Sequence, residues 1–71
     1  SGAQVRYGKP GFEVFLEDGR LWVFASGSEG LKSFLKTGEP AKSVTRVGAG
    51  PDGKTVKSDD NATLDAYLSA R

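Results

Sequence analysis

The sequence of 71 residues contains no cysteine and no histidine. Without cysteine there is no disulfide, and without both residues the usual structural zinc sites are excluded. The same absence removes the thiolate nucleophile and the imidazole base on which many catalytic centres depend. A domain this short buries only about 60% of the surface that its unfolded chain exposes, and such domains often need a staple. Good packing or self-association therefore has to supply the stability.

A strong charge of one sign and a long apolar run are also missing. Ten basic and nine acidic residues give a net charge of +1, which predicts no electrostatic footprint for nucleic acid or an anionic membrane. No apolar stretch has the length of a membrane span or of a signal-peptide core. We expect a chain that does not enter a membrane, either cytoplasmic or exported after removal of a signal. Its length suits one domain, at residues 12–71, preceded by an arm at residues 1–11.

The clearest local signal is a β-hairpin at residues 12–25. Two runs rich in aromatic and β-branched residues flank Asp18-Gly19, and such a two-residue loop favours a type I′ turn with positive φ at both positions. The loop also fixes the register, because Glu17 must then lie opposite Arg20. Two positions further along each strand, Phe15 lies opposite Trp22.

Apolar residues spaced i, i+3, i+4 predict two short helices. The first begins at Ser26 or Ser28 and ends at Gly38, where a left-handed residue suits the helix end and Pro40 prevents continuation. The second follows the acidic caps at residues 58–60. The apolar faces of the two helices consist of Leu31, Phe34 and Leu35, and of Leu64, Tyr67 and Leu68.

Two further strands are predicted at residues 44–47 and 54–57, joined by the turn at residues 50–53. In that turn Pro51 presets φ, and Asp52 is expected to bond its own backbone. The element order is then ββαββα. It predicts an α+β fold with a four-stranded antiparallel sheet and both helices packed on one face. Because the Asp-Gly turns and helix patterns of the two halves match, a duplicated ββα unit is one interpretation; shared turn and helix signatures alone are the other.

The hairpin register places a set of aromatic rings on the face that should meet water. One face carries only apolar side chains and should lie under the helices. The other face carries Phe15, Trp22 and Phe24 among charged residues, and three rings exposed together would form a patch near the upper limit for a monomer. We therefore expect a cover: the N-terminal arm, a second copy of the chain, or another partner. A bulge that exchanges the two faces is the alternative.

The glycine-rich segment Gly48-Ala49-Gly50 is a second candidate site. If the third strand neighbours the second, the missing side chains leave a trough beside Trp22 that could receive a ring or a ligand. The alternative is that these residues only serve the turn that follows. Residues 48–53 also spell G-x-G-x-x-G, but a strand follows instead of a helix, so a nucleotide site is not expected.

The sequence gives little support for a metal site or a catalytic site. The acidic residues at 59, 60 and 65 lack the spacing of a calcium loop and suit the start of a helix. We therefore expect no metal, no cofactor and no enzyme. The leading hypothesis is a self-associating protein-interaction module, a dimer or a complex with another protein, anchored by Phe15, Trp22 and Phe24 with Arg20 and Glu17 at the rim. The alternatives are a binder of single-stranded nucleic acid that stacks bases on the same rings, and a small-ligand-binding accessory subunit that uses the trough.

Overall fold

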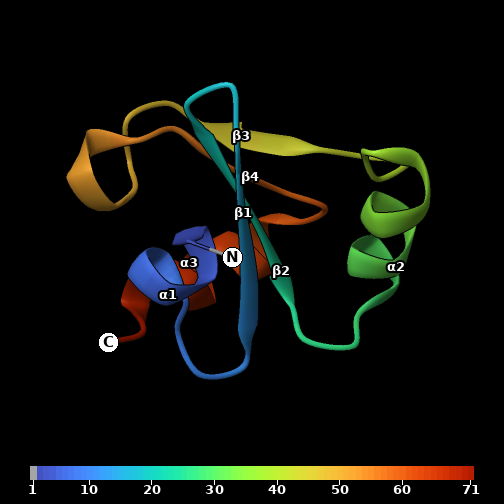
Figure 1. The fold of residues 1–71 in the computed structure, drawn as a ribbon, viewed down its shortest axis with the longest axis horizontal. Helices are drawn as coiled ribbons and strands as arrows, with labels where there is room; N and C mark the ends of the chain where they lie inside the picture. The colour runs from blue at the N-terminus through green and yellow to red at the C-terminus, as the bar shows by residue number, and fades with distance from the viewer. Residues whose placement is uncertain (1) are drawn as a thin grey trace.

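The computed structural model describes residues 2–71 as three α-helices, a 3-10 turn and four strands (Figure 1). This confirms a small α+β domain. In chain order the elements are α1 (Gly2–Tyr7), β1 (Phe12–Glu17), β2 (Arg20–Ala25), α2 (Glu29–Thr37), β3 (Val44–Arg46), the 3-10 turn η1 (Pro51–Gly53), β4 (Val56–Ser58) and α3 (Asn61–Ser69).

The hairpin of β1 and β2 forms as predicted. Glu17 pairs with Arg20 and Phe15 with Trp22 in an antiparallel ladder. Asp18 and Gly19 have φ values of 51° and 75°, the positive values that a type I′ turn requires. The two-residue loop therefore sets the register of the whole hairpin.

The predicted ends of α2 are also confirmed. Ser28 is the N-cap, and its hydroxyl accepts a hydrogen bond from the Leu31 amide at 3.2 Å. Ser28 takes this place rather than Ser26. Gly38 ends the helix with φ of 91°, and its amide donates to the Phe34 carbonyl.

The sheet is mixed rather than purely antiparallel. Its strand order is β1-β2-β4-β3, so β4 and not β3 lies beside β2. The β2–β4 pair is parallel, with Leu21 opposite Val56 and Trp22 opposite Lys57, whereas β3 and β4 are antiparallel. Val56 and Ser58 are fully buried while β3 is partly exposed, which explains why β4 takes the inner position.

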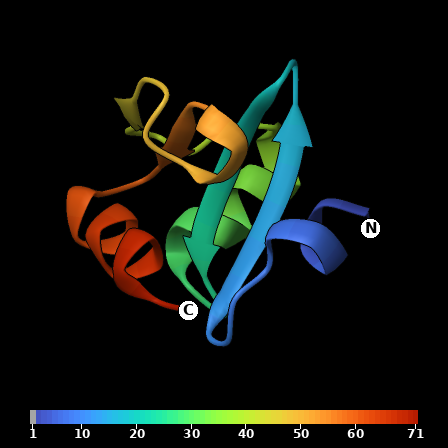
Figure 2. The same ribbon diagram turned by 90° about the vertical axis from the view of Figure 1, so that its left-hand side faces the viewer.

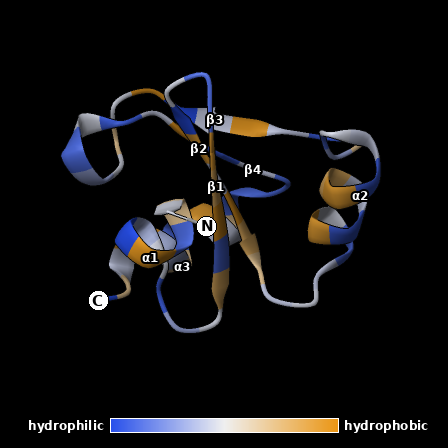
Figure 3. Ribbon diagram, viewed as in Figure 1, coloured by the Kyte–Doolittle hydropathy of each residue, from blue (hydrophilic) through white to orange (hydrophobic). Residues whose placement is uncertain are grey.

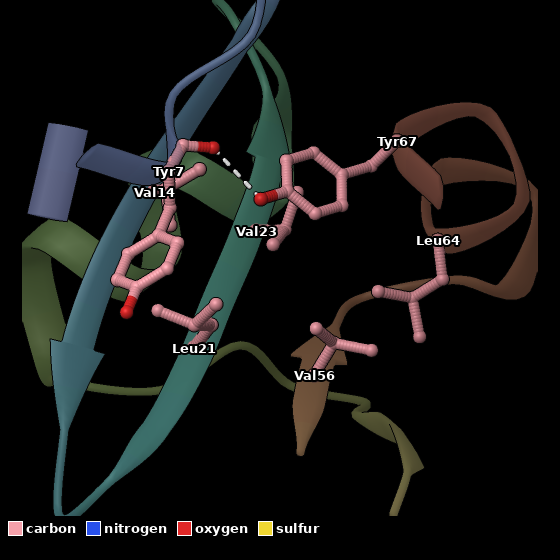
Figure 4. Close-up of a cluster of buried hydrophobic side chains, with 7 residues drawn as sticks. All are labelled: Tyr7, Val14, Leu21, Val23, Val56, Leu64 and Tyr67. Carbon is pink, nitrogen blue, oxygen red and sulfur yellow. Dashed lines mark hydrogen bonds between the residues drawn. The ribbon is translucent and has the colours of Figure 1, made fainter. Parts of the chain in front are cut away.

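The helices cover both faces of the sheet, which corrects the expectation that they share one. Helices α1 and α3 enclose the first core cluster (Figure 4). In it Leu64 and Tyr67 of α3 meet Val14, Leu21 and Val23 of the hairpin. The Tyr67 hydroxyl donates a 2.7 Å hydrogen bond to the Tyr7 carbonyl inside this cluster. The polar atom of the buried Tyr67 side chain is therefore hydrogen-bonded.

The second core cluster lies under α2. Leu31 and Phe34 of α2 pack on Trp22 and Phe24 of β2, with Phe15 at the margin. The apolar side of α2 turns toward the strands (Figure 3). The face predicted to be open therefore has a cover that belongs to the same chain.

The arm at residues 1–11, of which residue 1 lies outside the described residues, contains α1. It packs on the face opposite to the aromatic rings, for which it was one of the candidate covers. Tyr7 is only 8% exposed and belongs to the first cluster, away from the Phe15 ring. Lys9 then donates to the carbonyls of Tyr67 and Ala70, each at 2.7 Å. A cation at the C-terminal end of a helix is favoured by the helix dipole, so this lysine ties the arm to α3.

Replacing Trp22 with Ala should remove a large part of the stability of this domain. Trp22 is 7% exposed between the sheet and α2, and truncation of such a ring costs about 3–5 kcal/mol. Proteins of this length have a free energy of unfolding of about 4–11 kcal/mol. Urea denaturation followed by circular dichroism measures the loss. The control is Leu35→Ala. Leu35 lies on α2 and is 64% exposed, so this substitution should change the free energy of unfolding by less than about 1 kcal/mol. Equal losses in both variants would contradict the packing of Trp22 under α2.

Candidate functional site

The three aromatic anchors predicted from the sequence come together, but they do not form an exposed face. Phe24 is fully buried and Trp22 nearly so, and only Phe15 is partly exposed. The Trp22 and Phe24 rings are stacked at 5.9 Å, and Phe34 contacts both from α2 at 5.4 and 5.0 Å. The prediction of an exposed aromatic face is therefore wrong, and the need for an outside cover disappears with it.

The predicted rim residues stay at the surface. Glu17 and Arg20 face each other across the hairpin, and both are exposed. Lys57 of β4 lies on the same side of the sheet, with its Nζ 4.8 Å from the centre of the Trp22 ring. A lysine over the indole face adds a cation–π contact to the packing of Trp22.

The glycine trough does not lie beside Trp22. Because β4 separates β3 from β2, Gly48, Ala49 and Gly50 fall outside the aromatic cluster. The Gly50 amide donates to the Lys54 carbonyl at 2.8 Å, and a Cβ at Gly50 would collide with Val56. Close packing of the turn, the alternative interpretation, explains this glycine.

A hollow of about 290 Å³ lies between the first turn of α2 and the segment that precedes β3. Its lining includes the carboxylates of Glu29 and Asp59 and the ammonium of Lys42. Opposite charges on partly or fully exposed side chains select no particular ligand. Among residues 2–71 no group of three acidic side chains could hold a metal ion.

A polar contact that the sequence did not predict is made by Asp52 in η1, which bonds α1 rather than its own backbone. Its Oδ2 accepts hydrogen bonds from the Tyr7 hydroxyl at 2.8 Å and from Arg6 at 3.1 Å. The bond from Tyr7 lowers the pKa of Asp52, and the same bond raises the pKa of Tyr7. A phenol with a raised pKa is a poor proton donor at neutral pH. The pair therefore anchors α1 to the loop.

The outer edge of β1 is the feature that sequence reasoning missed. The Gln4 side chain lies against it like a short piece of a neighbouring strand: its Nε2 donates to the Phe12 carbonyl at 3.2 Å, and its Oε1 accepts from the Val14 amide at 2.8 Å. This covers only one end of β1. No sequence pattern in residues 2–7 predicts the contact between Gln4 and β1, because the partner atoms belong to the backbone of β1.

The other end of β1 is open. In an antiparallel pair alternate residues turn their backbone groups toward the partner. Glu17 pairs directly across the two-residue turn, so Phe15 and Glu13 also face β2, whereas Val14 and Leu16 face outward. Among residues 2–71 no hydrogen bond reaches the Leu16 amide, the Leu16 carbonyl or the Val14 carbonyl. We call this stretch, residues 14–17, the open edge.

Figure 2 shows the same asymmetry in the backbone. Helix α1 lies beside the lower part of β1, and no described segment runs along the outer side of β1 near its arrowhead. The Leu16 side chain is 47% exposed there. A free backbone ladder beside an exposed leucine is a template for another strand, which makes the open edge the best candidate site of this domain.

Asp52 should make the stability depend on pH at both ends of the scale. The folded pKa of its carboxyl is depressed, so its contribution is present above about pH 4 and is lost as the pH falls through the folded value. The Tyr7 pKa is raised, so that contribution is present below about pH 10 and is lost as the pH rises.

Urea unfolding between pH 2 and pH 11 tests this for the wild type and Asp52→Asn. The stability difference between the two should be level near neutral pH and should shrink below pH 4. Asp60→Asn is the control, because the Asp60 pKa is also lowered, by the Thr63 side chain and amide. A difference for Asp52→Asn that is the same at pH 7 and pH 2 would contradict the bond to Tyr7.

Replacing Gln4 with Ala should extend the open edge. The Val14 amide loses its acceptor, and a hydrogen bond worth about 0.5–1.5 kcal/mol predicts hydrogen exchange about two- to tenfold faster. Gln4→Glu is the matched control, since it keeps an acceptor for this amide and loses the donor to Phe12. The Leu16 amide should exchange rapidly in all three proteins, and a slow Leu16 amide would show that the edge is covered.

Comparison of the chain with protein-family models, with curated protein sequences and with solved structures found no match. No helix within residues 2–71 is long and apolar enough to cross a membrane. The open edge, with its free backbone groups at Val14 and Leu16, is the structural feature that points to a function.

Proposed function

We propose that this domain is a non-catalytic protein-interaction module that binds an extended segment of another protein along the open edge. The added strand would pair with the backbone groups of Val14 and Leu16 and extend the sheet beyond β1. The observation that carries the proposal is the half-covered edge, where Gln4 pairs with the backbone at one end and the other end is left free. Strand addition is a common mode of peptide recognition.

The energetics of such a complex favour recognition over chance contact. The strand and its turn are already ordered, so the domain loses little conformational freedom when a ligand binds. Three backbone groups would gain partners, and each net hydrogen bond contributes about 0.5–1.5 kcal/mol. The half-exposed Leu16 side chain adds apolar contact next to the ladder. Affinities in the micromolar to millimolar range follow from these contributions.

The other function classes receive less support. Stacking of nucleic-acid bases on Trp22 and Phe24 would require α2 to leave the sheet, because Phe34 contacts both rings. The same packing removes the basis for self-association through the aromatic face. A small-ligand function loses its proposed trough at Gly48–Gly50, which lies away from Trp22.

A duplicated ββα unit also stays a hypothesis. Both halves of the chain contain an antiparallel strand pair followed by a helix, in the order β1-β2-α2 and β3-β4-α3. Trp22 lies under Leu31 and Phe34, as Val56 lies with Leu64 and Tyr67. These parallels support a duplication without bearing on which partner the open edge binds.

Leu16→Pro should abolish strand addition without unfolding the domain. Proline removes the outward amide, is tolerated in edge strands, and breaks no bond of the β1–β2 ladder, because Leu16 faces outward. An isotope-labelled domain is titrated with a neutral peptide of alternating threonine and valine, and amide resonances are followed by NMR. The Phe15 and Leu16 resonances should move in the wild type, and the proline variant should bind at least about fivefold more weakly.

Leu16→Ala is the matched control, because it keeps the amide and loses only side-chain contact. Circular dichroism and urea unfolding establish that both variants fold. If Leu16→Pro folds and binds the peptide as well as Leu16→Ala does, the open edge is not the binding site and the proposal fails.

A further inference from the structure

The Gln4 side chain occupies a part of β1 that an added strand could also use. A glutamine carboxamide offers an oxygen acceptor and N–H donors, the same groups as a peptide bond. Gln4 uses both kinds of group on β1, at the Phe12 carbonyl and the Val14 amide. The carboxamide therefore stands in for one peptide group of a neighbouring strand, and it shows that this part of the edge accepts such a group.

Gln4 lies on a weakly held part of the arm. Within residues 2–6 no side chain is buried, and Gln4 itself is exposed. The ion pair of Arg6 with Asp52 is exposed on both sides, and such pairs contribute little to stability. A helix of six residues such as α1 is not stable without tertiary contacts. The first turn of α1 can therefore leave β1 at a small cost in free energy.

The arm is fixed more firmly from Tyr7 onward. Tyr7 is buried, and its carbonyl accepts the hydrogen bond of the Tyr67 hydroxyl. Lys9 holds the end of α3 through two carbonyls. Release of Gln4 thus requires movement only of the residues before Tyr7, and the arm stays attached as a tether. A group on a short tether has an effective concentration in the millimolar range, which a free peptide can match.

We propose that the binding edge runs from Phe12 to Leu16 and that Gln4 is a built-in competitor, which an extended peptide long enough to span these residues displaces. This inference rests on the edge-binding function above and adds how that site is regulated. The backbone of the peptide takes over the Phe12 carbonyl and the Val14 amide. Each bond made there replaces a bond lost by Gln4, so Gln4 lowers the affinity of the native domain for its partner.

Gly8 leaves the space in which Gln4 sits. A Cβ at Gly8 would collide with the backbone carbonyl oxygen and the carboxamide of Gln4. The φ of Gly8 lies outside the left-handed region, so no left-handed backbone requires glycine here. The collision with Gln4 is the obstacle to alanine at this position. Gly8→Ala should therefore push Gln4 away from β1 without a change to Gln4 itself.

NMR titration with the capped peptide Thr-Val-Thr-Val-Thr-Val-Thr tests the competition on the intact domain. The Leu16 amide reports binding, and the side-chain Nε2 resonances of Gln4 report displacement. In the wild type both should move together, with one dissociation constant. Gln4→Ala should bind the peptide at least about fivefold more tightly. The reason is that two hydrogen bonds, each worth about two- to tenfold in affinity, no longer have to be broken.

Three further variants separate competition from a general effect on the arm. Gln4→Glu should be intermediate, because it keeps the acceptor for the Val14 amide and loses the donor to Phe12. Gly8→Ala should bind about as tightly as Gln4→Ala. Val5→Ala is the matched control on the same helix: Val5 is exposed, so binding should stay within about twofold of the wild type. Circular dichroism and urea unfolding establish that the variants fold.

The remaining outcomes separate this inference from the function on which it rests. If the Leu16 amide moves while the Gln4 side-chain resonances stay in place, and Gln4→Ala binds no more tightly, the competition is wrong and edge binding stands. If the Leu16 amide moves in none of the proteins, the proposed function fails and this inference fails with it. If light scattering shows that Gln4→Ala forms a dimer that dissociates on dilution, a second copy takes the freed edge and the peptide partner is excluded.

Discussion

The burial of β2 on both of its faces is the constraint on which the rest of this domain depends. Four consecutive residues, Leu21 to Phe24, are at most 7% exposed. Because successive side chains of a strand point to opposite faces, no single layer of helices could cover them. One layer is α2, over Trp22 and Phe24, and the other is α3 with α1, over Leu21 and Val23. The strand also needs a neighbour on each side, which β1 and β4 provide.

The parallel pairing of β2 with β4 explains why the two main helices lie on opposite faces. Two similar hairpins whose inner strands are antiparallel are related by a half-turn about an axis perpendicular to the sheet, which leaves their helices on the same face. When the inner strands are parallel, the half-turn runs along the strands and exchanges the faces. The expected antiparallel sheet and the expected single layer of helices were thus one error with one cause.

Local chemistry was enough to predict the hairpin, the two longer helices and the approximate places of β3 and β4, but not α1. Tertiary packing decided the rest. Asp18-Gly19 specifies the hairpin register, and Ser28 and Gly38 bound α2, because each acts on atoms within a few residues of itself. The unbroken apolar run of β2 was the overlooked signal: strands buried on both faces read as continuous apolar stretches, whereas the apolar run of β1 is bounded by Glu13 and Glu17. The contact of Gln4 with β1 had no local signal at all, since its partners are backbone groups brought there by the fold.

An edge strand with free backbone groups is a hazard for any small domain, and charged residues along it are a common protection against self-pairing. Glu17, at the open end of β1, fits that role in this chain. Gln4 closes the half of the edge next to Phe12 and Val14, which includes Glu13, whereas the half that ends at Glu17 is open.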